Sequence, residues 1–344
     1  MSCADLHRTG EKNRLSDLGL ISLIILFLLL LGSCSSNASE LADKGYQLKK
    51  VVVFSRHNLR APLVSADSDV ARLTNNTWHL WDVPSGNLTP RGEVNEALMG
   101  HFFRCYLIDE GFMPENWQPS IGEVVFYANS FQRTITTARF FAGGMMPVAN
   151  IQVKYLKAID KSDEVFIRPL AFDTPRFYEL GMNFHNNKIP DYLMRAQKGV
   201  STLDKVLNFK NSPYASETGI DAMDPMDLSL RLRGNDNVVR YEGFFVKAYK
   251  ASDTLIMQYY DEPDDNKADW GAGLTENEWQ DIGLLYTLGL GMLVDNPALY
   301  LRNTNLLLQE IDAALKDENR KFTFLCGHDT NLVMLLNVLG AGDY

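Results

Sequence analysis

The sequence contains few of the residues on which several protein classes depend. It has four cysteines in 344 residues, which is too few for a disulfide framework in a chain of this length. It has no Lys/Arg-rich run and a formal net charge of −10, which argues against DNA or RNA as a partner, because clustered cations bind a phosphate backbone. No P-loop, GxGxxG loop, CxxC pair or HExxH motif occurs, so nothing predicts a nucleotide or zinc site.

The N-terminus contains an uncharged apolar run of 14 residues, 18–31. A membrane-spanning helix needs roughly 20 such residues, whereas this length is typical of a signal-peptide core. The run continues into Leu-Gly-Ser-Cys34, which resembles the lipobox of bacterial lipoproteins. We therefore expect a signal peptide over 1–33, lipidation of Cys34 and a polar tether over 34–45.

This N-terminus predicts an exported lipoprotein of the bacterial cell envelope, anchored to the membrane and facing the periplasm or the cell surface. An uncleaved anchor formed by the same apolar run is the alternative. Processing would remove Cys3 and lipidate Cys34, so Cys105 and Cys326 remain, and we expect both to be buried thiols.

Three times the chain passes from an apolar strand through a polar loop into a helix. The predicted strands cover 50–55, 123–128 and 321–326, and the last two lead directly into helices. Thr89 and Pro90 are typical of a helix start, and this helix continues to about residue 109. The pattern predicts an α/β fold with a mostly parallel central sheet and helices on both faces, which binds ligands beyond the carboxyl ends of its strands.

The strand signal fades between about residues 151 and 278, where polar connections alternate with helical segments such as 203–207 and 244–260. Two more helices are expected at 279–293 and 297–315. We therefore predict a discontinuous α/β domain over 46–150 and 316–344, with a mainly helical inserted domain over 151–315.

Chemically capable side chains follow the first predicted strand. His57 is an imidazole that, when neutral, can attack phosphorus without a separate base. Arg56 and Arg60 flank it, and planar guanidiniums match phosphate oxygens with paired hydrogen bonds. Taken alone, an Arg-His pair at a strand end is more often a surface ion-pair partner.

The other two strand ends supply groups of the same kind. Arg133 and His328 lie just past them and could add further donors to a phosphate site. Asp329 is an acid beside this anion site, where a carboxyl is inclined to hold its proton and could give it to a departing alcohol oxygen. A helix N-cap is the plainer interpretation of His328 and Asp329.

Two motifs give the sequence a family resemblance. Residues 56–62, RHNLRAP, resemble the RHGxRxP signature of the histidine acid phosphatases, and residues 327–331, GHDTN, resemble their second, HD-containing signature. The resemblance is closest to the periplasmic glucose-1-phosphatase branch, next to the bacterial phytases, where Asn replaces the glycine after the nucleophile. Asn58 is compatible with a turn that needs positive φ. Further stretches that fit are WDVPSG at 81–86, YANSFQRT at 127–134, MQYYDE at 257–262 and ADWG at 268–271.

The resemblance implies a phosphomonoester hydrolase in which His57 becomes phosphohistidine, Asp329 is the proton donor and water releases inorganic phosphate. It implies that the phosphate is held by Arg56, Arg60, Arg133 and His328. Its substrate would be a small phosphate monoester, either a sugar phosphate such as glucose 1-phosphate or an inositol phosphate such as phytate. No metal and no organic cofactor is implied.

The sequence departs from the family in three places. Members usually continue after the HD motif into a Gly-rich hairpin that adds to the sheet, whereas this chain stops at Tyr344. The cysteines of the branch's disulfides are absent. A carboxylate of the helical insertion shapes the substrate pocket of glucose-1-phosphatases, and Asp236 is a candidate for it.

Two alternatives follow from these departures and from the wider superfamily. A truncated, inactive lipoprotein could still bind phosphorylated sugars through its arginines. A phosphoglycerate-mutase-like transferase would share the nucleophilic histidine, but the Asp329 donor and the export signal argue against it. The sequence makes no prediction of oligomeric state.

Overall fold

The computed structural model describes residues 45–64, 68–167 and 169–341. The predicted signal peptide, Cys34 and nearly all of the tether lie outside these residues, so those predictions stay untested. In the described part, no single helix is long and apolar enough to span a membrane, although two consecutive helices bent by 70°, Glu276–Val294 and Pro297–Asn303, pass the same test together.

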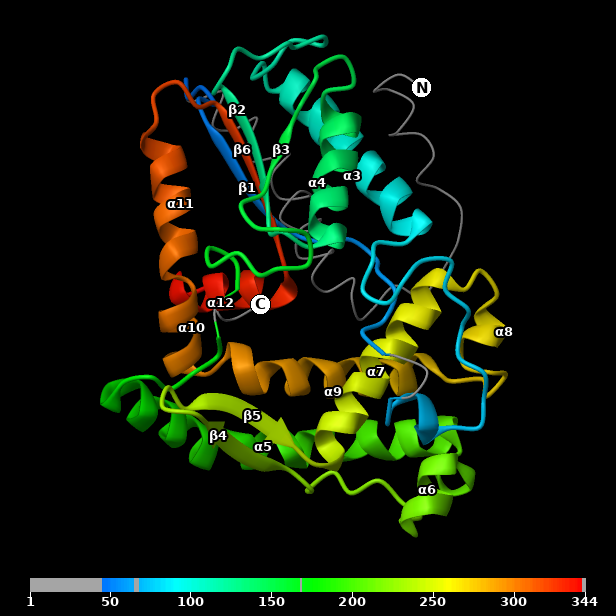
Figure 1. The fold of residues 1–344 in the computed structure, drawn as a ribbon. Helices are drawn as coiled ribbons and strands as arrows, with labels where there is room; N and C mark the ends of the chain where they lie inside the picture. Colours follow the sequence, from blue (N-terminus) through cyan, green and yellow to red (C-terminus); the bar gives the residue numbers. More distant parts are fainter. Residues whose placement is uncertain (1–44, 65–67, 168, 342–344) are drawn as a thin grey trace.

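A parallel sheet of four strands forms the upper part of the molecule in Figure 1. Its order is β1 (Val51–Arg56), β6 (Phe322–Gly327), β2 (Val124–Ala128) and β3 (Val153–Lys154). The structure confirms the three predicted strands to within one residue at each end. The two-residue β3 was not predicted, because so short a pairing leaves no periodicity to recognise.

Helices cover both faces of this sheet, as expected for parallel strands. They are α3 (Pro90–Asp109) and α4 (Gln132–Met145) on one face, and α11 (Asn305–Lys316) and α12 (Asp329–Val338) on the other. Side chains alternate along each strand, so Val53 of β1 packs towards α3 and α4 while Phe54 packs towards α11 and α12. The α/β fold is therefore confirmed.

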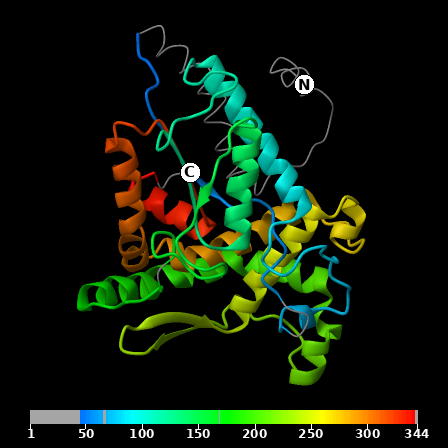
Figure 2. The same ribbon diagram turned by 45° about the horizontal axis from the view of Figure 1, so that its top comes forward.

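A second, helical body lies beyond the carboxyl ends of the strands (Figure 2). Its core is built mainly from three helices, α5, α7 and α9. Its helices are α5 (Pro175–Leu207), α6 (Pro213–Thr218), α7 (Phe244–Asp261), α8 (Asp265–Ala268), α9 (Glu276–Val294) and α10 (Pro297–Asn303). The division at residues 150 and 315 stays a prediction.

The region predicted as mainly helical also contains an antiparallel hairpin, β4 (Ser229–Arg233) with β5 (Val238–Glu242). The expectation that strand signal fades here was wrong at this point. The residues of β4 alternate between exposed and half-buried, so polar and apolar side chains alternate, and a Gly-Asn-Asp-Asn turn follows. Such alternation with a polar turn is a hairpin signal in its own right.

Two helix boundaries also differ from expectation. α5 runs unbroken for 33 residues through Pro190, whereas only 203–207 was named as helical. The predicted helix over 297–315 is divided at Thr304 into α10 and α11. Tertiary packing of an apolar face outweighs local propensity in a helix of this length.

The two remaining cysteines differ in state. Cys326 is a buried free thiol, as expected. Cys105 takes part in a disulfide bond, so the expectation of a second free thiol was wrong. Spacing alone could not reveal this pairing, because a disulfide depends on the distance between two Cα atoms in the folded chain.

The contact between α3 and α4 gives a stability prediction. A Cβ on Gly144 would lie 2.0 Å from the carbonyl oxygen of Ala97 on α3, whereas a Cβ on Gly143 would meet nothing within 4 Å. Gly144→Ala must therefore separate the two backbones, and we expect it to lower the free energy of unfolding by roughly 1–3 kcal/mol. Urea unfolding measures this.

Gly143→Ala in the same helix is the matched control. It should be neutral or stabilising by up to about 1 kcal/mol, because alanine is the better helix former. Equal unfolding midpoints for the two variants would contradict the close approach of α3 and α4.

Candidate active site

Three adjacent strands deliver polar side chains to one edge of the sheet. His57 follows β1, Asn129 follows β2 and His328 follows β6. The strand pairing continues through their backbones, since His57 N donates to Gly327 O at 3.0 Å and Asn129 N donates to Cys326 O at 2.9 Å. The imidazole rings of His57 and His328 consequently lie edge to face, with 5.5 Å between their centroids.

His57 is buried, and its ring has one nitrogen engaged. Nδ1 lies 2.7 Å from the carbonyl oxygen of Asn58, so the neutral ring is assigned a proton on Nδ1, which leaves the Nε2 lone pair free. Burial, followed by the charge of Arg56, lowers the pKa of His57 well below its usual 6.5. The ring therefore stays neutral, and able to act as a nucleophile, in acidic solution.

Positive charge is concentrated beside this ring. The charges of Arg56, Arg60 and Arg133 all act to lower the pKa of His57. Burial, followed by the charge of Arg60, also lowers the pKa of Arg133 to about 10. The buried Nε atoms of Arg56 and Arg133 have no hydrogen-bond partner. Buried donors with mutually repelling charges favour an anion that accepts from them.

The structure places Arg133 at the start of α4. Its guanidinium lies over the ring of Phe131, 4.6 Å from the centroid, and its Nη1 donates to Gly86 O at 3.3 Å. The phenyl ring and the carbonyl hold the side chain without neutralising it.

His328 is held as a neutral ring by Asn129, a residue that the sequence analysis did not single out. The Nδ2 of Asn129 lies 2.8 Å from His328 Nε2, so Asn129 donates and the His328 proton is assigned to Nδ1. Burial, followed by the charge of Arg133, lowers the pKa of His328 to about 3. A neutral His328 can donate from Nδ1 to a bound oxygen.

Asp329 is the first residue of α12 and has both carboxylate oxygens engaged. Oδ1 accepts from Thr330 N at 2.8 Å. Oδ2 accepts from the Tyr286 hydroxyl at 2.8 Å and lies 3.4 Å from Arg56 Nε. Burial raises the pKa of Asp329, but the charge of Arg56 and the Tyr286 hydrogen bond outweigh it and lower the pKa to about 2.

The expectation that Asp329 holds its proton is therefore wrong. The reason is that the charge of Arg56 and the hydrogen bond from Tyr286 stabilise the carboxylate. A bound phosphate would partly offset the arginine charge and raise the pKa of Asp329.

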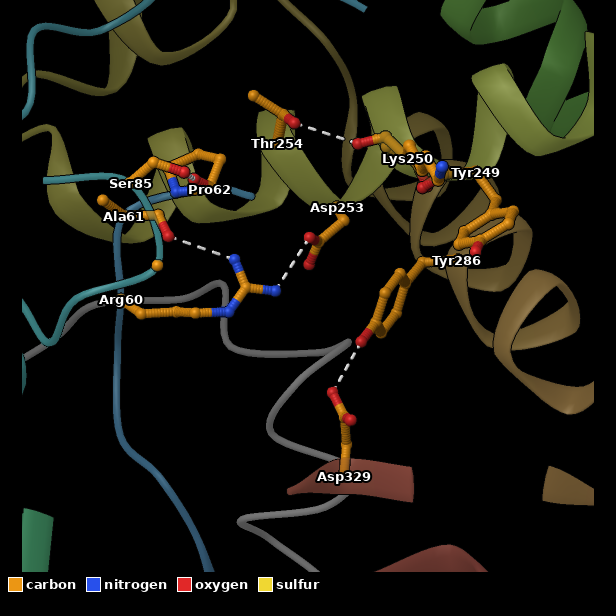
Figure 3. A network of polar contacts seen from close by, with 12 residues as sticks. Arg60, Ala61, Pro62, Ser85, Tyr249, Lys250, Asp253, Thr254, Tyr286 and Asp329 are labelled. Atoms are coloured by element: carbon orange, nitrogen blue, oxygen red, sulfur yellow. Dashed lines mark hydrogen bonds and ion pairs between the residues drawn. The ribbon is translucent and has the colours of Figure 1, made fainter. Parts of the chain in front are cut away.

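Figure 3 shows that α7 and α9 contribute two further residues to the site. Asp253 of α7 pairs with Arg60, with 3.0 Å between Oδ2 and Nη2, and Arg60 Nη1 donates to Ala61 O at 3.1 Å. Tyr286 of α9 points its hydroxyl at Asp329. Neither residue belongs to a recognisable motif. A single Asp or Tyr on a helix is common in any protein and does not indicate a site from the sequence alone.

A cavity of about 980 Å³ opens onto this site. Arg56, His57 and Asp329 line it, and an aromatic wall from the helical body includes Tyr259, Tyr286 and Trp279. Asp236, the candidate pocket carboxylate, is instead exposed at the turn between β4 and β5 and is not among the residues that line the cavity.

The described residues contain no group of three or more His, Cys, Asp or Glu side chains placed to hold a metal ion. The site thus gathers all six residues predicted from the two motifs and the third strand end. It adds Asn129 from that same strand end and Asp253 and Tyr286 from the helical body.

Comparison with known proteins agrees with this geometry. The family description "Histidine phosphatase superfamily (branch 2)" matches residues 47–344. The chain belongs to this superfamily.

Individual members of the histidine phosphatase superfamily match over most of the chain. The glucose-1-phosphatase of Salmonella typhimurium is 29% identical over 317 residues, which is 90% of this chain and 75% of that protein. The phytase AppA of Escherichia coli is 25% identical over 336 residues, covering 91% and 76%. The solved apo structure of Hafnia alvei phytase superposes with a TM-score of 0.75 at 27% identity, covering 86% and 75%.

Proposed function

We propose that this chain is an acid phosphatase, a phosphomonoester hydrolase that forms a covalent phosphohistidine at His57. The observation that carries the proposal is a buried, neutral imidazole that feels the charges of Arg56, Arg60 and Arg133. The Nε of Arg133 has no hydrogen-bond partner and that of Arg56 has only its ion pair with Asp329, which supports a bound oxyanion. The three arginines and His328 hold the phosphoryl oxygens.

The first chemical step joins His57 to phosphorus. Nε2 attacks, the P–O bond to the alcohol breaks, and the ring becomes positively charged with its proton still on Nδ1. At acidic pH a phosphate monoester carries one proton, because its second pKa is about 6. That proton passes to Asp329, whose pKa the bound phosphate raises, and from Asp329 to the departing alcohol oxygen.

The second step regenerates the enzyme. The carboxylate of Asp329 accepts a proton from water as the water oxygen attacks phosphorus and the N–P bond breaks. Asp329 then returns this proton to the departing phosphate, which leaves as the singly charged anion at acidic pH, and the carboxylate and the neutral imidazole are restored. The same carboxyl therefore acts as acid and then as base. Both steps use only the side chains of this chain and water.

Sugar phosphates and phytate are the proposed substrates, on the strength of the relatives named glucose-1-phosphatase and phytase. The aromatic wall and the volume of about 980 Å³ suit a ring-shaped leaving group. Inorganic phosphate released from glucose 1-phosphate and from phytate near pH 5 tests the proposal. Calorimetric binding of glucose 1-phosphate without release would favour a binding protein instead.

We also propose that the chain is exported and anchored to the bacterial envelope through Cys34. The apolar run at 18–31 and the lipobox-like Leu-Gly-Ser-Cys34 support this. Cells that express the full chain should incorporate labelled palmitate into it, and Cys34→Ser should abolish the label. Labelling that persists in the variant would contradict anchoring at Cys34.

A further inference from the structure

Glu96 of α3 is a buried carboxyl group that the proposed reaction does not use. It is only 4% exposed, although it lies within a helix whose other acidic residues, Glu93 and Asp109, are half-buried and exposed. Glutamates are almost never fully buried unless they are paired. In the part of the chain that the structure describes, Glu96 forms no ion pair, so another contact must account for its position.

That contact is with the residue after the nucleophile. Asn58 Nδ2 donates to Glu96 Oε2 at 2.8 Å. The remaining polar groups of Asn58 are also engaged: its backbone N donates to Thr137 Oγ1 at 3.1 Å, its Oδ1 accepts from Leu59 N at 2.8 Å, and its carbonyl oxygen lies 2.7 Å from His57 Nδ1.

Asn58 is not among the residues with positive φ, so the expectation of a turn that needs positive φ was wrong. The side chain, rather than the backbone torsion, is what Asn58 contributes here. Its amide ties Asn58, whose carbonyl accepts the hydrogen bond from His57 Nδ1, to Glu96 of α3, and the Asn58 backbone N adds a second tie to Thr137 of α4.

We propose that Glu96 is a positioning residue for the nucleophile: by holding the Asn58 amide, it fixes the carbonyl that binds His57 Nδ1 and so directs Nε2 at phosphorus. The proposal rests on the proposed function of His57. Positioning by Glu96 matters most in the phosphoenzyme, where the His57 ring is positively charged and the Nδ1–H···O bond to Asn58 is stronger.

The surroundings of Glu96 favour its neutral form. Burial raises the pKa of Glu96 to about 7, and the Asn58 hydrogen bond only partly opposes this. The Asn58 amide donates to it, and the buried Cys326 thiol of β6 lies close enough to interact with it, since the pKa of that thiol is raised by burial and by Glu96. Neither group is a cation that would stabilise a carboxylate.

Ionisation of Glu96 above about pH 7 thus introduces an uncompensated buried charge behind the nucleophile. We expect the site to relax and turnover to fall as the pH rises through this value, while acidic solution preserves the geometry. This links the position of Glu96 to activity at acidic pH.

The test measures kcat and KM for glucose 1-phosphate between pH 4 and 9. The variants compared are Glu96→Gln, Glu96→Leu, Asn58→Gly and the double variant that combines Glu96→Leu with Asn58→Gly. Glutamine accepts the same hydrogen bond but cannot ionise, so Glu96→Gln should keep kcat within about threefold at pH 5 and lose the decline near pH 7 that belongs to Glu96. Glu96→Leu should lower kcat by roughly 10- to 100-fold with KM within about twofold. In the Asn58→Gly background, Glu96→Leu should cause little further loss of kcat, because the hydrogen bond that it removes is already absent.

Thermal unfolding at pH 5 and pH 8 separates positioning from stability. The wild-type protein holds a proton on Glu96 that the unfolded chain releases, so its stability falls as the pH rises from about 4.5 through about 7; Glu96→Gln should lack this fall. A folded Glu96→Leu variant with wild-type kcat, or an unchanged pH profile in Glu96→Gln, would overturn the proposal. If wild-type protein releases no phosphate, the proposed function fails instead.

Discussion

Phosphate release from glucose 1-phosphate should fall by roughly 10⁴-fold or more when His57 is replaced by alanine. The proposed reaction is divided into two displacements by a covalent intermediate, and among the residues that the structure describes we assign its formation to the Nε2 of His57. The remaining arginines would still bind the phosphate, so we expect KM or the inhibition constant of inorganic phosphate to change far less than kcat.

Rapid quenching into base adds a direct measurement. Wild-type protein mixed with ³²P-labelled substrate should retain label on the denatured chain, and His57→Ala should retain none. His185→Ala is the matched control, because His185 lies on α5, contacts Tyr241 and does not line the cavity. Wild-type turnover in the His57→Ala variant would show that the nucleophile is elsewhere.

Replacing Asp329 by asparagine should cost roughly 10²- to 10⁴-fold in kcat on glucose 1-phosphate, because a sugar oxygen leaves poorly without a proton. On 4-nitrophenyl phosphate, whose leaving group is stable as an anion, we expect a much smaller loss in the first step. Asparagine preserves the size of the side chain and an acceptor for the Tyr286 hydroxyl. The ratio of the two losses in kcat therefore measures the contribution of proton donation by Asp329.

Release of 4-nitrophenol and of phosphate, followed separately at pH 5, measures this ratio. A burst of nitrophenol in Asp329→Asn would show that the phosphoenzyme forms but hydrolyses slowly, as expected if Asp329 also activates water. Asp312→Asn, at an exposed position of α11, is the control for loss of a surface charge. Equal losses on both substrates would assign Asp329 a structural role through Arg56 and Tyr286.

Asp329 also shows why a catalytic acid can be ionised at rest. The charges of Arg56 and Arg60, which we propose hold the phosphate, stabilise its carboxylate and help to lower its pKa to about 2. The substrate supplies both the opposing charge and, at acidic pH, the proton. Above about pH 6 the ester loses that proton, so a decline in activity towards neutral pH follows from the substrate as well as from Glu96.

The sequence was sufficient to predict the strands that carry the site. Each is a short apolar run followed by polar residues, and parallel strands bring their carboxyl ends to one edge. His57 and His328 could therefore be expected to meet although they are far apart in the chain, and Arg133 could be added from the end of β2, which pairs with the other side of β6.

The site residues of the helical body could not be predicted from the sequence. Asp253 and Tyr286 reach the site only because α7 and α9 cross beyond the strand ends, and helical periodicity says which face is apolar but not what lies opposite a polar side chain. Asp236 failed as a candidate for the same reason, since the hairpin that carries it holds it in solvent.

By itself, then, the sequence determined the α/β fold and the gathering of its strand ends at one edge, and it supplied the proposed nucleophile, because these follow from local patterns repeated along the chain. Only the tertiary structure decided which side chains tune those groups: the ionised state of Asp329, the neutral ring of His328 against Asn129 and the burial of Glu96 against Asn58. The physical reason is that a pKa depends on burial and on charges a few ångströms away, and those neighbours are brought together from distant segments by packing.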